Sequence, residues 1–408
     1  GLEKFPPPQK RIFRGSIVNP QTDFHADYYE DGGLAVETDG TVKAIGEFDL
    51  VRAGLKDLGY EVVDETKDGE RKVIIPGMCD LHVHWVQDKV RGLFKGPLLR
   101  WLEKDIWPEE ALYGDEEFAD VRAREFFQGL FKCGTTVAAI YSSIHEQALR
   151  AAFRHAVGRM VIGNVIMTSD FPPYLKQNPA DALSLTARLA DEFGGNFAVT
   201  PRFAPSCSAE VLRDAGKIAR GRKTWVQTHL SENHDGSEHD EVELVRRLFP
   251  EARDYTDVYD RAGLLGDRSI MAHAIHVSDT ELRRLSSTGT NIAHCPTSNL
   301  ALESGTMPLE RVMDEEIAFA LGSDIGAGPS LSMFHVMQTY RTVHAPAISI
   351  SPTAALYRAT LAGAKILGIG GLTGNLNRGK EASFAVLQRN GTRKIDTADE
   401  LMAGVLEG

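Results

Sequence analysis

Eight short apolar runs, each followed by polar or small residues and then by an amphipathic stretch, dominate the chain from residue 73 onward. The runs lie near 73–84, 134–142, 158–167, 196–206, 224–232, 269–277, 290–299 and 318–328. The amphipathic stretches include 117–132, 180–192, 209–220, 240–248 and 279–286. Eight strand–helix alternations in about 255 residues predict an α/β fold, a (β/α)8 or TIM barrel. A doubly wound open sheet is the alternative.

Histidines and charged residues gather at the carboxyl ends of these runs. They are His82 and His84 in the first run, Arg202 in the fourth, His229 and Glu232 in the fifth, His273 in the sixth, His294 in the seventh and Asp324 in the eighth. In a barrel these ends meet at one face, where active sites form. Residues scattered along an open sheet would have no common destination, so this pattern favours the barrel.

Part of this set has the composition of a metal site. Alternate residues of a strand share one face, so His82 and His84 can point at one ion. Together with His229 and Asp324 they fit one catalytic zinc per subunit, with a water as the remaining ligand. Iron also suits such a set. Arg202 ends the fourth run where a metal-bridging carboxylated lysine would need a lysine, so we expect a single metal.

The remaining polar residues predict proton transfer. Zinc lowers the pKa of a bound water to about 7, and a nearby acid must then move protons. Glu232, just after the fifth run, is placed to do so without binding the metal. Asp324 could take a proton from the water, and His273 could polarise the bond under attack or lie outside the metal's ligand set. We expect His294 to be structural and His344 to lie on the surface.

The two ends of the chain differ from the repeating part. Short strand patterns separated by glycine and aspartate turns occur near 13–18, 33–37, 42–45, 60–63 and 381–387. Alternating apolar residues bounded by such turns predict strands. We expect residues 1–72 and 371–408 to form one small β-sandwich domain, beside a barrel of residues 73–370.

Composition narrows the class of protein. The net charge is −12, which makes a nucleic-acid-binding surface improbable as the main function. The four cysteines are far apart, as in a cytoplasmic protein with reduced thiols. The first residues lack the apolar core of a signal peptide, and we expect no membrane span. The expected partner is therefore a small molecule.

Several short motifs follow one another along the chain. They are PGMCDLHVH at 76–84, PLLRWLEK at 97–104 followed by Pro108 and Glu110, TPRF at 200–203, HLSEN at 229–233, VYD at 258–260, MAH at 271–273, AHCPTSNL at 293–300 and GSDIGAG at 322–328. Together they resemble the amidohydrolase superfamily and, within it, the guanine deaminases. The resemblance covers most of the chain between residues 70 and 385.

The resemblance implies a reaction and a set of contacts. Zinc-activated hydroxide would attack C2 of guanine, and Glu232 would protonate the ring and then the leaving amine, giving xanthine and ammonia. Gln87 and Arg202 would hydrogen-bond the purine edge. Aromatic and aliphatic side chains would pack on the purine face, namely Phe203, Leu99 and Trp101. The resemblance also implies a homodimer.

Departures from the family pattern leave other functions open. A polar insertion, His234–His239, follows the fifth run, and Asn164 and Thr168 replace the lysine and aspartate that guanine deaminases commonly carry. Both changes could reshape the mouth of the site. The alternatives are a deaminase of a pterin, a modified purine or a triazine, and a catalytically silent barrel that serves as a scaffold.

Overall fold

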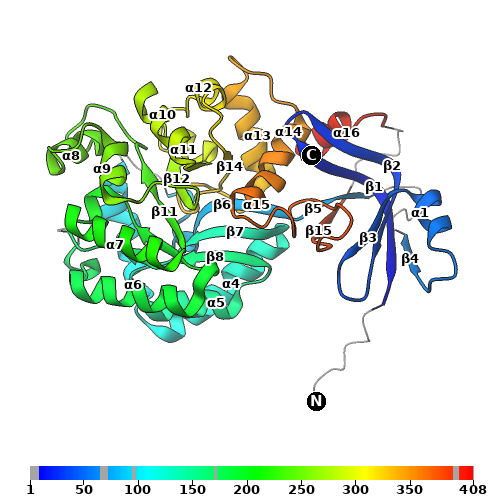
Figure 1. Cartoon of the computed structure of the whole chain (residues 1–408), viewed down its shortest axis with the longest axis horizontal. Coiled ribbons are helices and arrows are strands. Elements are labelled where there is room, and N and C mark those ends of the chain that lie inside the picture. The colour runs from blue at the N-terminus through cyan, green and yellow to red at the C-terminus, as the bar shows by residue number, and fades with distance from the viewer. Residues whose placement is uncertain (1–8, 65–71, 94–97, 170–171, 389–394, 408) are drawn as a thin grey trace. The chain divides into compact units, whose positions relative to one another are not determined.

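The chain divides into two compact units. The computed structural model describes residues 9–64, 72–93, 98–169, 172–388 and 395–407. One unit comprises residues 1–78 and 350–408, and the other comprises residues 79–349 (Figure 1). The expected division lay at 72/73 and 370/371, so the smaller unit takes residues from both ends of the region assigned to the barrel. Residues 1–8 and Pro97 of the PLLRWLEK motif lie outside the described residues.

The larger unit contains the strands of the repeating pattern. They are β6 (Met78–His84), β7 (Thr135–Tyr141), β8 (Arg159–Gly163), β9 (Val165–Ile166), β10 (Ala198–Pro201), β11 (Trp225–Leu230), β12 (Ser269–His273), β13 (Asn291–His294) and β14 (Phe319–Leu321). Strands β8 and β9 are two parts of one run. The strands pair in sequence order, as β6-β7-β8 and as β9 through β14.

Main-chain hydrogen bonds join the first strand to the last. The N–H of Asp324, just after β14, donates to the carbonyl of His82 (2.8 Å), and the N–H of His84 donates to the carbonyl of Ile325 (2.9 Å). An isolated bridge likewise connects β8 to the residue before β10. The strands therefore close into a ring, and the predicted (β/α)8 barrel is confirmed, whereas an open sheet would leave two unpaired edges.

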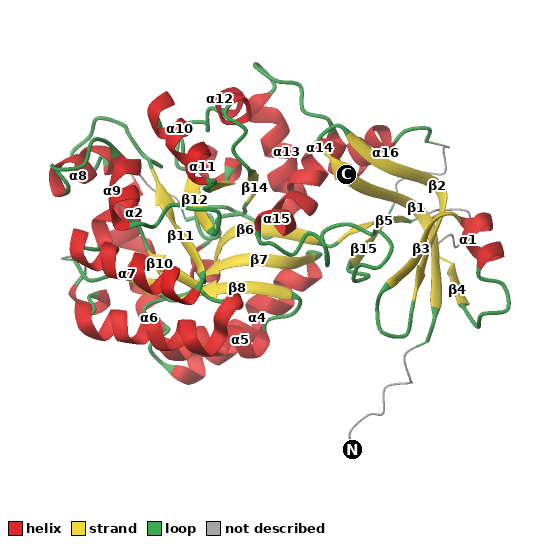
Figure 2. Cartoon of the chain, viewed as in Figure 1, coloured by secondary structure: helices red, strands yellow, loops and turns green. Residues whose placement is uncertain are grey.

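Helices flank the barrel strands (Figure 2). They are α4 (Glu116–Lys132), α5 (Glu146–His155), α6 (Pro179–Phe193), α7 (Ala209–Arg222), α8 (Glu241–Leu248), α9 (Tyr255–Ala262), α10 (Asp279–Thr288), α11 (Pro296–Ala301), α12 (Leu309–Asp314) and α13 (Met333–His344). Six of them, α4 and α6 through α10, begin after a residue whose side chain accepts main-chain N–H groups of the first turn. Asp115, Ser208 and Ser278, for example, cap α4, α7 and α10 by accepting main-chain N–H groups.

An irregular helical segment connects β6 to β7 and later forms one wall of the site. It contains η2 (Trp85–Val90), α2 (Leu98–Trp101), the π-helical turn η3 (Leu102–Ile106) and α3 (Trp107–Leu112). Its apolar residues pack in a buried cluster that includes Trp101, Ile106 and Trp107. Burial of these large side chains fixes the segment against the barrel.

The smaller unit is built on one sheet from both chain ends. Its strands are β1 (Arg11–Thr22), β2 (His25–Val36), β3 (Val42–Glu47), β4 (Glu61–Asp64), β5 (Val73–Pro76) and β15 (Phe384–Leu387). The order is β15-β5-β1-β2-β3, with β4 also on β1. The expected sandwich is thus a single hydrogen-bonded sheet. The first part of the run 73–84 belongs to it because Ile74 packs with Ile17 and Leu34 in that unit's core.

Four helices complete the smaller unit. They are α1 (Phe48–Gly54), α14 (Pro352–Arg358), α15 (Leu361–Ile366) and α16 (Ala398–Glu407). Arg358 of α14 forms an ion pair with Asp23 beside the β1–β2 turn (2.7 Å), which links the two chain ends again. Within the described ranges, every helix is too short or too polar to cross a membrane.

Candidate active site

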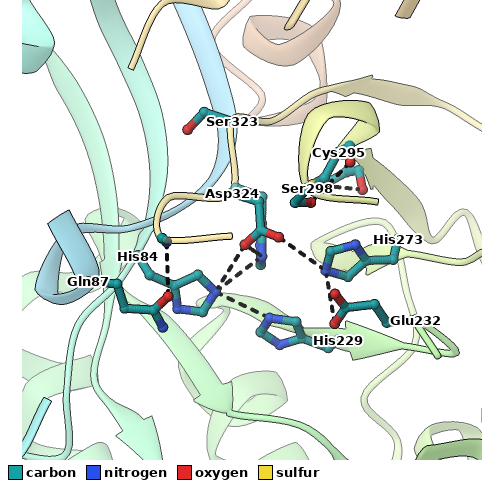
Figure 3. Close-up of polar contacts among 12 residues, drawn as sticks. His84, Gln87, His229, Glu232, His273, Cys295, Ser298, Ser323 and Asp324 are labelled. Carbon is teal, nitrogen blue, oxygen red and sulfur yellow. Dashed lines mark hydrogen bonds and ion pairs between the residues drawn. The ribbon is translucent and has the colours of Figure 1, made fainter. Parts of the chain in front are cut away.

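The polar residues at the strand ends converge inside the barrel, as predicted. His82 and His84 alternate on β6, and His229 is the second-last residue of β11. His273 ends β12, and Asp324 follows β14. Figure 3 shows His84, His229 and His273 directed toward Asp324. All five side chains are buried.

The backbone is strained at the same strand ends. Ser231 (φ 48°), His273 (φ 72°), Ala274 (φ 48°) and Asp324 (φ 50°) are non-glycine residues in the left-handed region. Such conformations cost about 1–3 kcal/mol each and persist where the surrounding structure holds them. Their gathering at the ends of β11, β12 and β14 marks this face as the functional one.

Four ligand atoms have the spacing of a tetrahedral metal site. His84 Nε2 lies 3.2 Å from His82 Nε2 and 3.2 Å from His229 Nε2. Asp324 Oδ1 lies 3.2 Å from His82 Nε2 and 3.6 Å from His84 Nε2. Ligands about 2.1 Å from one zinc, at tetrahedral angles, are roughly 3.4 Å apart. Because the four atoms match this spacing, the donor set fits one ion.

A hydrogen bond to His229 and the burial of the imidazoles support this arrangement. His229 Nδ1 donates to the Arg202 carbonyl oxygen (2.6 Å), which leaves the Nε2 lone pair directed at the cluster. Burial lowers the pKa of His84 and His229 well below the ordinary value, so both imidazoles are neutral at physiological pH. Neutral imidazole is the form that binds metals.

His273 lies beside these four atoms. Its Nε2 is within 4.8 Å of ligand atoms of His82, His229 and Asp324. It approaches Asp324 through the other carboxylate oxygen, Oδ2 (3.8 Å), and lies 3.4 Å from Glu232 Oε2. His273 therefore stands between the metal cluster and Glu232. Its Nδ1 donates to Asn299 Oδ1 (2.8 Å), which keeps Nε2 as the acceptor, and burial lowers its pKa to about 4.

The pKa values of two buried carboxyl groups in the site are shifted in opposite directions. Burial, reinforced by Asp324 and Glu241, raises the pKa of Glu232 well above its ordinary value. Burial also opposes ionisation of Asp324, but the adjacent His82 outweighs it, so the pKa of Asp324 is lowered. Carboxyl groups whose environments push their pKa values apart are suited to act as acid and base.

A further buried carboxylate holds the Glu232 loop, and sequence reasoning missed it. Glu241 Oε2 accepts the main-chain N–H groups of Glu232 and Asn233 (3.0 Å each). Glu241 Oε1 accepts the hydroxyl of Tyr255 (2.6 Å). The inserted residues 234–239 thus lie in a loop that closes on Glu241. In the sequence, an acidic residue such as Glu241 indicates only where a helix begins, so its contact with the Glu232 loop could not be predicted.

The cluster opens on a pocket. Its lining comprises His84, Gln87, Leu98, Trp101, Leu102, Arg202, Phe203, His229, Glu232, Asp324 and Ala327. Four of the five predicted substrate contacts are present. Leu99 is not among them and is half-buried. Positions 98, 101 and 102 share one face of the helical segment, and Leu99 is rotated away from it.

Glu110 connects the two polar recognition residues. Arg202 Nη1 donates to both oxygens of Glu110 (2.7 and 2.6 Å), and Gln87 Nε2 donates to Glu110 Oε1 (2.8 Å). Glu110 is fully buried and does not itself line the pocket. Its place in the family motif was visible in the sequence, whereas its pairing with Arg202 depends on the tertiary fold.

The departures from the family pattern lie away from the pocket. None of the described lining residues belongs to the insertion 234–239, and neither Asn164 nor Thr168 lines the pocket. Asn164 Nδ2 donates to the Ile144 carbonyl (3.0 Å).

His294 and His344 form a buried pair outside the cluster. Their Nε2 atoms are 2.9 Å apart, and both side chains are buried. The expectation that His344 lies on the surface is wrong because α13 packs against α11 and covers it. Burial lowers the pKa of His344 to about 4.

Comparison with known proteins identifies the family. A family model described as the amidohydrolase family matches residues 73–401. The chain belongs to the amidohydrolase family. Amidohydrolases are metal-dependent hydrolases, and in this member the His–Asp cluster occupies the carboxyl ends of the barrel strands, as the resemblance predicted.

Relatives with known names are similar along most of this amidohydrolase chain. It is 34% identical to the guanine deaminase of Escherichia coli K12 over 386 residues, 92% of this chain and 86% of that protein. The solved structure of E. coli guanine deaminase superposes with a TM-score of 0.88, at 32% identity, over 97% of this chain and 94% of that one. A guanine deaminase from C. acetobutylicum with bound guanine in its active site gives a TM-score of 0.82, at 29% identity, over 92% and 90%.

Proposed function

We propose that the protein is a guanine deaminase, which hydrolyses guanine to xanthine and ammonia. The observation that carries the proposal is the composition of one pocket. Glu232, three of the proposed metal ligands (His84, His229 and Asp324) and the donors Gln87 and Arg202 all line it. The named relatives, similar over nearly the whole chain, support guanine as the substrate.

His82, His84, His229 and Asp324 would hold one metal ion, which we propose is zinc. The three Nε2 atoms and one carboxylate oxygen have the required spacing, and three nitrogens with one oxygen suit zinc, although iron accepts them too. When bound, zinc supplies a water with a pKa near 7. Metal analysis of protein purified without added metal distinguishes zinc from iron.

Three residues would move or direct protons. Glu232, whose raised pKa favours the protonated form, donates a proton to the purine ring nitrogen. It then takes the proton of the hydroxyl group added at C2 and passes that proton to the leaving amine, and the proton accepted by Asp324 restores Glu232. Asp324, with its lowered pKa, accepts a proton from the attacking water. His273 Nε2 lies between the two carboxyl groups and accepts a hydrogen bond there, since Asn299 holds the proton on Nδ1.

The remaining lining residues would hold the purine. Gln87 and Arg202 donate hydrogen bonds to its edge, and Phe203 and Trp101 cover its faces. Leu98 and Leu102 take the place that we had predicted for Leu99. The apolar part of the wall excludes water from the ring, which strengthens the polar contacts.

The test is ammonia release from guanine by protein of measured metal content. We expect turnover that rises with metal occupancy, together with formation of xanthine. A panel containing a pterin, a modified purine and a triazine separates the rival deaminases, since the true substrate must have the highest kcat/KM. Full metal occupancy with no turnover of guanine would overturn the proposal, and no turnover of any compound would favour a scaffold.

We also propose a cellular location and an oligomeric state. We infer a cytoplasmic protein, because all four cysteines are free thiols, and a homodimer, because the family resemblance implies one. Light scattering at micromolar concentration would measure a mass of about twice 44.8 kDa for a dimer. A monomer mass would contradict the dimer and leave the reaction unaffected.

A further inference from the structure

A buried carboxylate stands directly behind the two polar recognition residues. Glu110, on α3, is completely buried, and Arg202 is 3% exposed. Their ion pair has distances of 2.6 and 2.7 Å. A buried ion pair is rarely retained for stability alone, because desolvation of both groups offsets much of the attraction. Its position beside the pocket indicates a role in recognition.

The same carboxylate fixes the orientation of the Gln87 side-chain amide. Gln87 Oε1 accepts the main-chain N–H of Gly326 (2.9 Å), and Gln87 Nε2 donates to Glu110 Oε1 (2.8 Å). A main-chain N–H can only donate, and a carboxylate facing an amide accepts from its nitrogen. The oxygen and nitrogen of this amide are therefore assigned by chemistry, and the amide cannot turn over without losing both bonds.

As a result, the part of the pocket wall formed by Gln87 and Arg202 presents hydrogen-bond donors. Arg202 has five N–H groups and no acceptor. Gln87 Oε1 is turned toward the Gly326 N–H, which leaves the oxygen one further lone pair, whereas Gln87 Nε2 still has a second N–H to donate. The Glu110 carboxylate cannot serve a ligand, since its oxygens accept from Arg202 and Gln87 and it does not line the pocket.

We propose that Glu110 is a specificity-determining residue that fixes Arg202 and Gln87 as a wall of donors and so selects 6-oxopurines over 6-aminopurines. This inference rests on the proposed function. Guanine presents two acceptors, O6 and N7, on the edge remote from C2, whereas a 6-aminopurine presents a donor in place of O6. A 6-amino group would face N–H groups and leave buried donors unpaired, which strongly disfavours binding.

The test compares two substrates that both carry the amine at C2. Guanine and 2,6-diaminopurine differ in the group at C6, and ammonia release reports both reactions. For the wild type we expect kcat/KM to favour guanine by about 100-fold or more. In Glu110→Gln, kcat/KM for guanine should fall by about 10- to 100-fold, mainly through KM, because the donors lose their fixed partner. The preference for guanine should shrink by at least about 10-fold.

A matched variant and a binding measurement complete the design. Glu103→Gln changes an exposed glutamate of the same segment and should alter neither kinetics nor preference. Hypoxanthine and adenine, which lack the amine at C2, serve as competitive inhibitors. Their ratio of inhibition constants should move with the substrate preference in Glu110→Gln, and metal content should stay at the wild-type value.

The outcomes separate this inference from the proposed function. If wild-type protein does not turn over guanine, the proposed function fails. If wild-type protein is active and Glu110→Gln keeps its preference for guanine, or loses both substrates equally, the inference about Glu110 is overturned. Should Glu110→Gln not fold, Gln87→Met removes one donor and leaves the ion pair intact. An unchanged preference in Gln87→Met would then overturn the inference.

Discussion

Two polar clusters contribute residues to the lining of one pocket, and they are built on opposite principles. The metal cluster comprises His82, His84, His229 and Asp324, and the recognition cluster comprises Gln87, Glu110 and Arg202. In the metal cluster, electron-pair donors face one another: His84 Nε2 lies 3.2 Å from His82 Nε2 and from His229 Nε2, and Asp324 Oδ1 lies 3.2 and 3.6 Å from His82 and His84. In the recognition cluster, by contrast, the side chains of Gln87, Glu110 and Arg202 are joined by N–H donors that face carboxylate or amide oxygens.

The difference shows what each cluster needs from outside the chain. The metal cluster becomes complementary only when a cation is placed among its lone pairs. The recognition cluster is complementary by itself, so it is ordered before any ligand arrives, and preorganisation of this kind raises selectivity. We therefore expect the two clusters to respond differently to metal removal, to substitution and to pH.

Metal removal gives the largest expected effect. After treatment with a chelator, turnover of guanine should fall below detection, since no side chain in the pocket can supply hydroxide at neutral pH. Saturating metal should stabilise the fold by about 4 kcal/mol at a thousand times its Kd, measured by calorimetry. The recognition cluster should survive, so hypoxanthine should bind the metal-free protein within about 10-fold of its original affinity. Loss of that binding would show that the clusters are not independent.

Glu232→Gln tests the proposed proton carrier, which belongs to neither cluster. The amide keeps the size of the side chain and cannot donate an acidic proton, so kcat should fall by about 10²- to 10⁴-fold. KM and metal content should stay near wild-type values, because Glu232 is proposed neither as a ligand nor as a purine donor. This pattern is the reverse of that for Glu110→Gln. A variant that loses its metal would contradict the role given to Glu232.

The sequence predicted the metal cluster well because its geometry follows from periodicity. Alternation on β6 places His82 and His84 on one face, and closure of the barrel brings the ends of β11 and β14 to them. Both arguments need only strand position. The backbone strain at His273 and Asp324 could not be predicted, since histidine and aspartate adopt a positive φ more often than most residues but only at a small fraction of their positions.

The recognition cluster was predicted only in part because it depends on an irregular segment. Glu110 and Arg202 are 92 residues apart, and their contact requires the path of α2, η3 and α3. Positions 98, 101 and 102 share one face of this segment, so Leu98 lines the pocket where Leu99 was expected. The run 73–84 shows a similar limit, because an apolar pattern does not reveal that β5 pairs with β1 in the other unit.

Glu241→Gln should have an intermediate effect, because Glu241 holds the main chain of Glu232 and contacts neither cluster. A glutamine retains one acceptor for the two N–H groups and places an amide nitrogen against the Tyr255 hydroxyl. We expect kcat to fall by about 3- to 10-fold with KM unchanged, measured by steady-state ammonia release. Tyr255→Phe is the matched control, since it keeps both main-chain bonds and should cost less. An effect on KM alone would place Glu241 in recognition instead.

Glu146→Gln gives the smallest expected effect and compares a surface ion pair with the buried one at Glu110. Arg188 and Arg150 lower the pKa of Glu146 from 4.5 to about 2, and its side chain is 29% exposed. A lowered pKa stabilises the fold above pH 4.5, and the contribution is lost as the pH falls toward 2. Because solvent screens the pair, we expect a loss of about 0.5–1 kcal/mol at pH 7 in urea unfolding, and a smaller loss at pH 3.5.

The exposed Glu251→Gln serves as the control for this comparison and should change stability at neither pH. Equal effects of Glu146→Gln and Glu251→Gln at pH 7 would contradict the surface pair's contribution. Glu110→Gln should instead destabilise by about 3–5 kcal/mol, because it leaves the buried Arg202 charge without its partner. If Glu146→Gln and Glu110→Gln lowered the free energy of unfolding equally, burial would not distinguish the recognition cluster from a surface ion pair. The selectivity argued for Glu110 would then need a cause other than its ion pair.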